Sequence, residues 1–323
     1  MNETEALSKK VGEWLKSEGY PTEFQVANIF AKSGFHVRQS QFVRDVEENI
    51  PREIDVVADI NAESAQHSLL RISHVVECKW SQDKPWVALC GRHGTRMAPS
   101  ACITQSFASS LANAILWADA GNPELEALSL FATPEVPGFG GRQAFSKGHD
   151  VFYGAMSSIV SAAHSKIAQY KEEKSATFLL PRIAVVAFPL IVVDGKLFKA
   201  AYDADEGEVT IAETKSVRFH WRGSAAWPHH ASVDIVTLEH ANEFVEQRRK
   251  DVEILIRAMR AKHEELIECY KSRSMTPLKI TDGPRGIIGR PQLLQRLQER
   301  RAIPRSRAQD IESRKPKKSP NEG

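Results

Sequence analysis

The stretch LLRISHVVECKW, residues 69–80, decides the fold. It has the pattern of a buried strand, and this strand ends in two residues of opposite charge. Apolar and β-branched residues dominate it, and neither Gly nor Pro interrupts it, which is typical of a buried strand. Side chains alternate along a strand, so Glu77 and Lys79 project from one face and Cys78 from the other. A carboxylate and an ammonium group are costly to desolvate unless they are paired or bind a metal ion. This end of the strand is therefore a candidate functional site.

A second apolar strand with a charge inside it comes earlier in the chain. The sequence REIDVVADI, residues 52–60, places Asp55 within an apolar run, and residues 35–46 form the strand before it across a short turn. This hairpin and the stretch that follows it put three strands side by side, so Asp55 and Glu77 can meet on one face. An acidic residue two positions before a lysine occurs three more times in the chain, but never within such an apolar strand.

A helix before these strands supplies a third carboxylate. In YPTEFQVANIFAKSGF, residues 20–35, Thr22 can cap the helix with Gln25 at the reciprocal position of a capping box, and Gly34 ends it. Glu23 lies in the first turn, where the helix dipole favours an anion, and it shares a face with the apolar stripe. An acidic residue in a first turn is ordinary by itself, but its place on the apolar face makes Glu23 a further candidate for the site.

These side chains form a set that suits divalent-cation chemistry. Mg²⁺ prefers oxygen ligands and usually keeps several waters, so one or two carboxylates and a substrate phosphate suffice to hold it, and Mn²⁺ can substitute. Asp55 and Glu77 are the expected ligands, and the backbone carbonyl of Cys78 could add another. Lys79 could stay charged and orient the attacking water, or burial could lower its pKa enough for general-base work. Glu23 could complete the water network or a second metal site.

At these positions the chain resembles the PD-(D/E)XK, or restriction endonuclease-like, superfamily of nucleases. The resemblance covers about residues 20–86 and is carried by Glu23, Asp55, Glu77 and Lys79. It is similar above all to type IV restriction enzymes and bacterial defence nucleases. Ile54 stands where a proline usually precedes the first metal ligand, so the motif departs from the family pattern there. The resemblance implies an α/β fold with a mixed sheet flanked by helices, and metal-dependent hydrolysis of phosphodiester bonds by these four residues.

Several functions fit this pattern. The leading one is a DNA endonuclease that acts in restriction or anti-phage defence, and a structure-specific repair nuclease or an RNase is the alternative among enzymes. The alternative from another class is a nucleic-acid-binding module that has a nuclease-like fold but does not cleave nucleic acid. A partly buried ion cluster of Asp55, Glu77 and Lys79 would explain the charges without any function.

Two further expectations concern partners of the chain. The Gly-rich residues 137–149 lack the pattern G-x-x-x-x-G-K-[ST], so any nucleotide-driven activity has to come from another chain, such as a partner protein of a defence system. The two-fold geometry of double-strand cutting favours a homodimer.

Composition indicates a globular protein of the cytoplasm. The 323 residues, 42% hydrophobic and 26% charged, suffice for one or two domains with a large core. Four scattered cysteines form no disulfide framework, which suits a reducing compartment, and Cys90-x-x-His93 is only half of a zinc site. The longest apolar run, residues 183–193, is too short to span a bilayer, and the N-terminus has no signal-peptide core.

The charge distribution divides the chain at residue 270. Residues 271–323 hold 14 Lys and Arg against 5 Asp and Glu, a net +9, and the first 270 residues hold the other 29 and 36, a net −7. We expect a nuclease domain over residues 1–270 and a basic, largely disordered tail over residues 271–323. The charge of the tail suggests a polyanionic partner, DNA or RNA, but charge alone is explained as well by a solvated disordered end. Within the tail, only residues 291–302 read as helical.

The remaining periodicities predict further elements around this core. Apolar residues at helical spacing predict helices over residues 1–19, 100–118, 150–171 and 239–270. Strand patterns cover residues 183–193, 196–202, 208–221 and 233–238, the first of them as a central strand buried on both faces. Asp194-Gly195 predicts a hairpin between the first two of these strands. An irregular loop is expected at residues 81–99, where four side chains could contact a substrate: Trp86, Arg92, His93 and Arg96.

Overall fold

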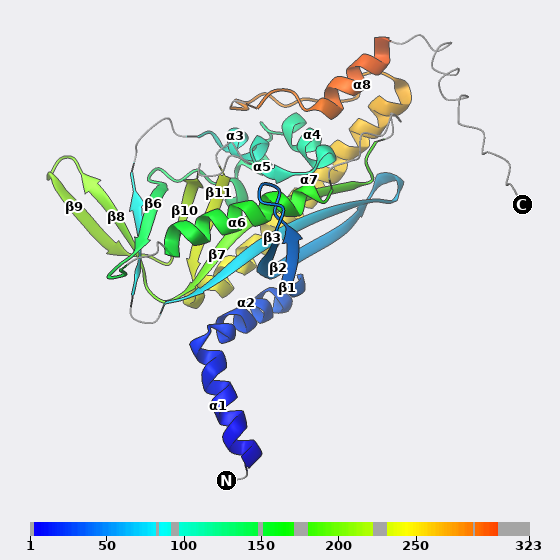
Figure 1. Cartoon of the computed structure of the whole chain (residues 1–323). Helices are drawn as coiled ribbons and strands as arrows, with labels where there is room; N and C mark the ends of the chain where they lie inside the picture. Colours follow the sequence, from blue (N-terminus) through cyan, green and yellow to red (C-terminus); the bar gives the residue numbers. More distant parts are fainter. Residues whose placement is uncertain are drawn as a thin grey trace, which may run out of the picture.

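A mixed β-sheet flanked by helices gives the chain an α/β architecture (Figure 1). The computed structural model describes residues 3–81, 84–91, 97–147, 151–170, 180–221, 231–286 and 288–302. The strands are β1 (His36–Arg44), β2 (Pro51–Ser64), β3 (Ser68–Trp80), β4 (Trp86–Cys90), β5 (Phe107–Ala108), β6 (Gly138–Gln143), β7 (Ile183–Asp194), β8 (Leu197–Asp203), β9 (Glu208–Glu213), β10 (Ser216–Trp221) and β11 (Ala231–Thr237). Within the described residues they form one sheet in the order β1-β2-β3-β7-β11-β10-β6-β4-β8-β9, and β5 pairs with β7.

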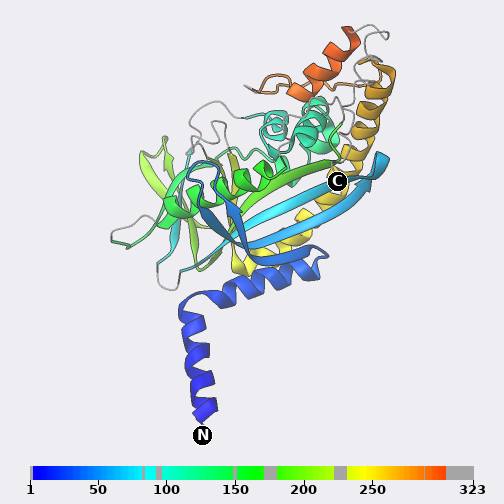
Figure 2. The same ribbon diagram turned by 45° about the vertical axis from the view of Figure 1, so that its right-hand side comes forward.

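Helices cover both faces of this sheet. They are α1 (Glu3–Ser17), α2 (Tyr20–Lys32), α3 (Pro99–Thr104), α4 (Ser110–Ala118), α5 (Pro123–Glu126), α6 (Val151–Ala168), α7 (Ala241–Ser272) and α8 (Gln292–Ala302), with 3₁₀ turns η1 (Ala65–His67), η2 (Ser129–Phe131) and η3 (Leu238–His240). Phe30 of α2 lies in one core cluster with Val76, and Met156 of α6 lies in another with Val75. Since neighbouring residues of a strand face opposite ways, β3 is covered on both sides. Helix α1 projects away from the sheet (Figures 1 and 2), and none of its residues is buried. None of the helices in the described part of the chain is long and apolar enough to cross a membrane.

Strand β3 joins the two halves of the sheet. It pairs antiparallel with β2 as far as Val56–Val76, and parallel with β7 as far as Trp80–Asp194. The apolar side chains of β3 and β7 are largely buried, so both predicted buried strands are confirmed. Parallel neighbours need a long crossover, and residues 81–182 supply it here.

The crossover between β3 and β7 differs from the prediction. The single helix expected over residues 100–118 is two helices, α3 and α4, with β5 between them. Ser109 accounts for the break: its backbone N–H donates to the Val185 carbonyl at 2.9 Å, and its Oγ accepts from the Val185 N–H at 2.9 Å. The chain bonds to β7 at this point instead of continuing the helix. The loop expected at residues 81–99 contains the strand β4.

Two residues that the sequence indicated as a helix cap and a hairpin turn, Thr22 and Asp194, have other roles in the structure. Thr22 is not a helix cap, because α2 begins at Tyr20 after Gly19 and the Thr22 hydroxyl donates to Oδ2 of Asp194 at 3.0 Å. The predicted hairpin at Asp194-Gly195 is wrong, because β8 pairs with β4 and β9 and not with β7. Asp194 instead holds the start of α2 beside the ends of β3 and β7.

The chain after α7 packs onto the body of the protein, so the predicted boundary at residue 270 is wrong. The helix continues to Ser272, and the expected helix over residues 291–302 is confirmed as α8. Four leucines from this part of the chain lie in the core cluster that also contains α4 and α7: Leu278, Leu293, Leu294 and Leu297. A charge count could not reveal this packing, because a few leucines are enough to anchor a basic segment. Residues 303–323 of the expected tail lie outside the described residues.

A close backbone contact anchors the segment between α7 and α8. The Gly121 N–H donates to Oγ1 of Thr281 at 2.8 Å, and the Thr281 N–H donates to the Ala118 carbonyl at 2.9 Å. A Cβ atom on Gly121 would lie 1.5 Å from the carbonyl oxygen of Asp282. Only glycine allows the two backbones to approach this closely.

We predict that Leu294→Ala lowers the free energy of unfolding by about 2–4 kcal/mol, because Leu294 is fully buried and its loss leaves a cavity. The control is Glu299→Ala on the exposed side of α8, which should change the free energy of unfolding by less than about 0.5 kcal/mol. Urea unfolding of both variants measures the difference. Equal stability of the two variants would contradict the packing of α8 onto the core.

Candidate functional site

The candidate site lies where β2 separates from β3. The last registered pair between the two strands is Val56–Val76, but β3 continues along β7 to Trp80. Just past that pair, Oδ2 of Asp55 accepts the backbone N–H of Cys78 at 2.7 Å. The Asp55 carboxylate thus satisfies a backbone donor of β3 that pairing with β2 no longer satisfies.

Glu77 and Lys79 form an ion pair beside this point. Nζ of Lys79 lies 2.5 Å from Oε1 of Glu77, which confirms that the two side chains share one face of β3. Glu77 is buried and Lys79 is partly buried, so the pair is shielded from bulk water. A shielded pair interacts more strongly than an exposed one and fixes both side chains in place.

Helix α2 places Glu23 within electrostatic reach of the Glu77–Lys79 ion pair. The helix starts beside the end of β3, where a Cβ on Gly19 would lie 3.3 Å from Cβ of Trp80. Burial raises the pKa of Glu23, the charges of Glu53 and Glu77 raise it further, and Lys79 lowers it. Glu23 therefore lies within electrostatic reach of the ion pair, as its place on the apolar face of the helix suggested.

The environment shifts the protonation of Asp55 and Lys79 in ways that bear on their roles. Burial and then the Glu77 charge raise the pKa of Asp55 to about 7, against the opposing effects of the Cys78 N–H and of Lys79. Burial alone would lower the pKa of Lys79, but the ion pair with Glu77 and the charge of Asp55 raise it above its ordinary value. Lys79 is therefore charged at neutral pH, which favours an orienting role over general-base work.

The acidic groups outnumber the basic one, which makes the site suitable for a cation. When ionised, Asp55, Glu77 and Glu23 carry three negative charges against the single positive charge of Lys79. Burial raises the pKa of the Cys78 thiol well above its ordinary value, so Cys78 would offer its backbone carbonyl and not a thiolate. Two carboxylates and one carbonyl suit Mg²⁺, which usually completes its shell with water and substrate phosphate. Among the described residues, no group of three or more His, Cys, Asp or Glu is arranged to hold an ion by itself.

Of the four residues after β3 that were predicted to contact a substrate, the structure describes only Trp86. Trp86 is fully buried, with its ring centroid 5.4 Å from that of Phe152, so it is a core residue and not a substrate contact. Arg92, His93 and Arg96 lie outside the described residues, and so does the zinc half-site that His93 would complete with Cys90.

A second buried acid on β2, Asp59, was missed in the sequence although it lies only four residues after Asp55. Ser73 donates to Oδ1 of Asp59 at 2.5 Å, Arg38 pairs with its Oδ2, and Nε of Arg71 lies 3.9 Å away. Two guanidinium groups and a hydroxyl therefore compensate this one carboxylate. The signal that could have found it is the second acid in the run REIDVVAD.

Comparisons of the chain with protein-family models, with curated proteins and with solved structures find no match. The interpretation of the site therefore depends on its own geometry and charge.

We predict that Asp55→Asn removes a pH dependence of stability in metal-free protein. The pKa of Asp55 is about 7 in the folded chain and near 3.8 when unfolded, so between these values the folded state binds more protons. Wild-type stability should therefore fall as pH rises from about 4 to about 7, by up to roughly 1.4 kcal/mol per pH unit. Asn keeps an acceptor for the Cys78 N–H but does not titrate, so this contribution should vanish.

The measurement is urea unfolding across that pH range in the presence of EDTA. Glu208→Gln, which removes an exposed carboxylate on β9, is the control and should follow the wild-type profile. Parallel profiles for Asp55→Asn and wild type would show that Asp55 titrates normally.

Proposed function

We propose that the chain is a metal-dependent nuclease that hydrolyses phosphodiester bonds of DNA at the site of Asp55, Glu77, Lys79 and Glu23. The observation that carries the proposal is the divergence of β2 from β3, which brings the Asp55 carboxylate to the backbone beside the Glu77–Lys79 pair. The resemblance of these residues to the PD-(D/E)XK superfamily supports a restriction endonuclease-like core. A role in restriction or anti-phage defence, with a partner protein of such a system, depends on that resemblance alone.

Each residue has a role that its surroundings support. Asp55, Glu77 and the Cys78 carbonyl would hold Mg²⁺ or Mn²⁺, which supplies Lewis-acid activation of water and charge neutralisation at the scissile phosphate. Lys79, fixed by its ion pair with Glu77, orients the water and stabilises negative charge on the phosphate in the transition state. Glu23 has a raised pKa and can exchange a proton with the water network.

Comparison with Asp59 argues against a purely structural ion cluster. Two arginines surround Asp59, so its charge is compensated by neighbouring side chains. At Asp55 the nearest charged neighbours include another carboxylate, and a single lysine serves the whole group. Buried charges that only stabilise a fold are normally paired, whereas an excess of one sign is typical of a site that binds a partner of the opposite charge.

Three alternatives share the site or the fold. A structure-specific repair nuclease or an RNase would use the same residues on another substrate, and a binding module would hold nucleic acid without cutting it. The free cysteines of the described chain, Cys78, Cys90, Cys102 and Cys269, accord with action in the reducing cytoplasm.

We predict that Lys79→Ala retains metal and DNA binding but loses cleavage about a hundred- to a thousandfold, because one preorganised electrostatic group is lost. Glu77→Ala should lose metal affinity as well, because it deletes a ligand. The control is Lys196→Ala, which removes an exposed lysine with the same acid-x-Lys spacing and should cut at the wild-type rate. Cleavage of DNA and RNA panels with Mg²⁺, Mn²⁺ or EDTA is measured together with the melting temperature of each variant.

The outcomes separate the alternatives. RNA cleavage without DNA cleavage selects the RNase, and binding without any cleavage selects the binding module. If Lys79→Ala cuts as well as wild type, the active site lies elsewhere, and if Lys79→Ala unfolds, the cluster is structural.

We predict that deleting residues 303–323 weakens DNA binding and flattens its salt dependence without lowering the melting temperature. This segment holds 6 Lys and Arg against 3 Asp and Glu, a net +3, and a chain that neutralises fewer phosphates releases fewer counterions. Affinity measured at several salt concentrations gives the slope, which should fall by about 0.9 for each phosphate that is no longer neutralised. Deletion from residue 273 is the contrasting truncation, because it removes α8 and its buried leucines and should lower the melting temperature. An unchanged slope would assign residues 303–323 to another role.

A further inference from the structure

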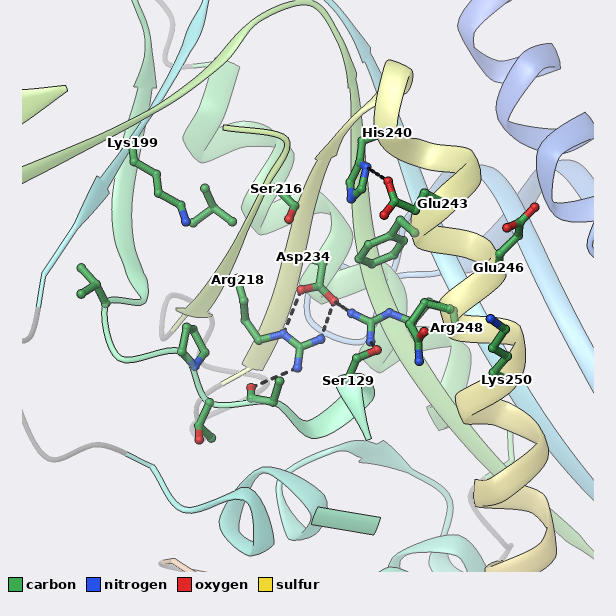
Figure 3. Close-up of a pocket in the computed structure, with 17 residues that line it drawn as sticks. Ser129, Lys199, Ser216, Arg218, Asp234, His240, Glu243, Glu246, Arg248 and Lys250 are labelled. Atoms are coloured by element: carbon green, nitrogen blue, oxygen red, sulfur yellow. Dashed lines mark hydrogen bonds and ion pairs between the residues drawn. The ribbon is translucent and has the colours of Figure 1, made fainter. Parts of the chain in front are cut away.

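A pocket of about 650 Å³ is lined by β10 and β11, which lie on the side of β7 away from β3 (Figure 3). Its walls come from segments far apart in the sequence: residues 129–136, Lys199 of β8, Ser216 to Arg218 of β10, Asp234 of β11, and residues 240–250 at the start of α7. The volume is within the usual range for a pocket that binds a small molecule.

Two arginines share one carboxylate at the floor of this pocket. Arg218 donates from Nε and Nη2 to the two oxygens of Asp234 at 2.8 and 2.6 Å, and Arg248 donates from Nη2 to Oδ2 at 2.8 Å. Figure 3 shows the two guanidinium groups approaching Asp234 from opposite sides. Asp251 lies behind the floor, 3.7 Å from Arg248, and also accepts the Leu130 N–H. The floor is therefore rigid, since packing and hydrogen bonds hold each guanidinium.

Positive charge is in excess inside the pocket. Lys199 reaches in from β8 and has no ion-pair partner among the described residues. With Arg218 and Arg248 it gives three positive charges, against two negative charges from Asp234 and Asp251. The remaining charged lining residues, Glu243, Glu246 and Lys250, are exposed at the rim. Burial lowers the pKa of Arg248 to about 10 against the opposing charge of Asp234, and the charge of Arg218 adds to the lowering.

We propose that this pocket binds a small molecule that carries a phosphate group. The fixed positive charges of Arg218 and Arg248 attract a phosphate, although many of their N–H groups already donate within the protein. Lys199 adds an ammonium group that can donate hydrogen bonds to the phosphate oxygens. Phe244 and Val217 supply apolar lining for the rest of the ligand, as is usual in small-molecule pockets. The proposal is independent of the nuclease function, because it uses no residue of the Asp55 site.

The experiment measures binding of pyrophosphate and of AMP by isothermal titration and by the shift in melting temperature. Sodium chloride at equal ionic strength is the reference, and EDTA excludes phosphate binding through a metal ion at the Asp55 site. Wild type should bind at least one of the two ligands and melt at a higher temperature in its presence. Lys199→Gln should weaken binding about tenfold, because it removes a charge-assisted hydrogen bond.

Lys215→Gln is the matched control, since Lys215 is exposed, follows β9 and does not line the pocket. It should bind as wild type does, and so should Asp55→Asn. Tighter binding of AMP than of pyrophosphate identifies a phosphorylated organic ligand, and the reverse identifies a free phosphate species. No binding by wild type overturns the proposal, and so does equal binding by Lys199→Gln and Lys215→Gln.

Discussion

The parallel pairing of β3 with β7 is the constraint on which the rest of the structure depends. It unites the hairpin of β1 and β2 with the strands that follow residue 180, and it allows helices to cover the sheet on both faces. The same pairing creates the candidate site. Because β7 supports β3 up to Trp80, β2 and β3 can separate beyond the Val56–Val76 pair without exposing the end of β3. The charged residues then occupy a rigid, partly desolvated place at the divergence.

Desolvation connects this architecture to chemistry. Burial and the Glu77 charge disfavour the ionised form of Asp55, and Lys79 offsets only part of the cost. A divalent cation would relieve what remains, so the charge imbalance itself supports the proposed cofactor. Arg218 and Arg248 present the inverse situation around Asp234, where the excess is positive and the proposed ligand is a phosphate. At both sites, buried charge that neighbouring side chains do not fully compensate favours a ligand of the opposite charge.

The sequence was informative where local pattern decides structure. Hydrophobic runs predict the two buried strands that carry Asp55 and Glu77, and strand alternation predicts that Glu77 and Lys79 share one face, where they form an ion pair. Prediction failed where distant segments decide. Ser109 bonds to β7 and breaks a helical pattern, and Asp194 binds Thr22 in place of forming a hairpin. The pocket at Asp234 could not be foreseen either, because its walls come from segments that only the folded sheet brings together.

The contact of Gly121 with the segment after α7 has a consequence for how the chain resists proteases. Three hydrogen bonds of Thr281 and a backbone approach that only glycine permits hold residues 281–283 against the end of α4. These residues connect α7 to α8, so their release would uncover the buried leucines of α8 together with the apolar surface beneath them. Such a local opening costs less free energy than global unfolding and sets the rate of cleavage in the native state. A side chain at residue 121 would force the two backbones apart and should therefore make the C-terminal part of the chain easier to cut.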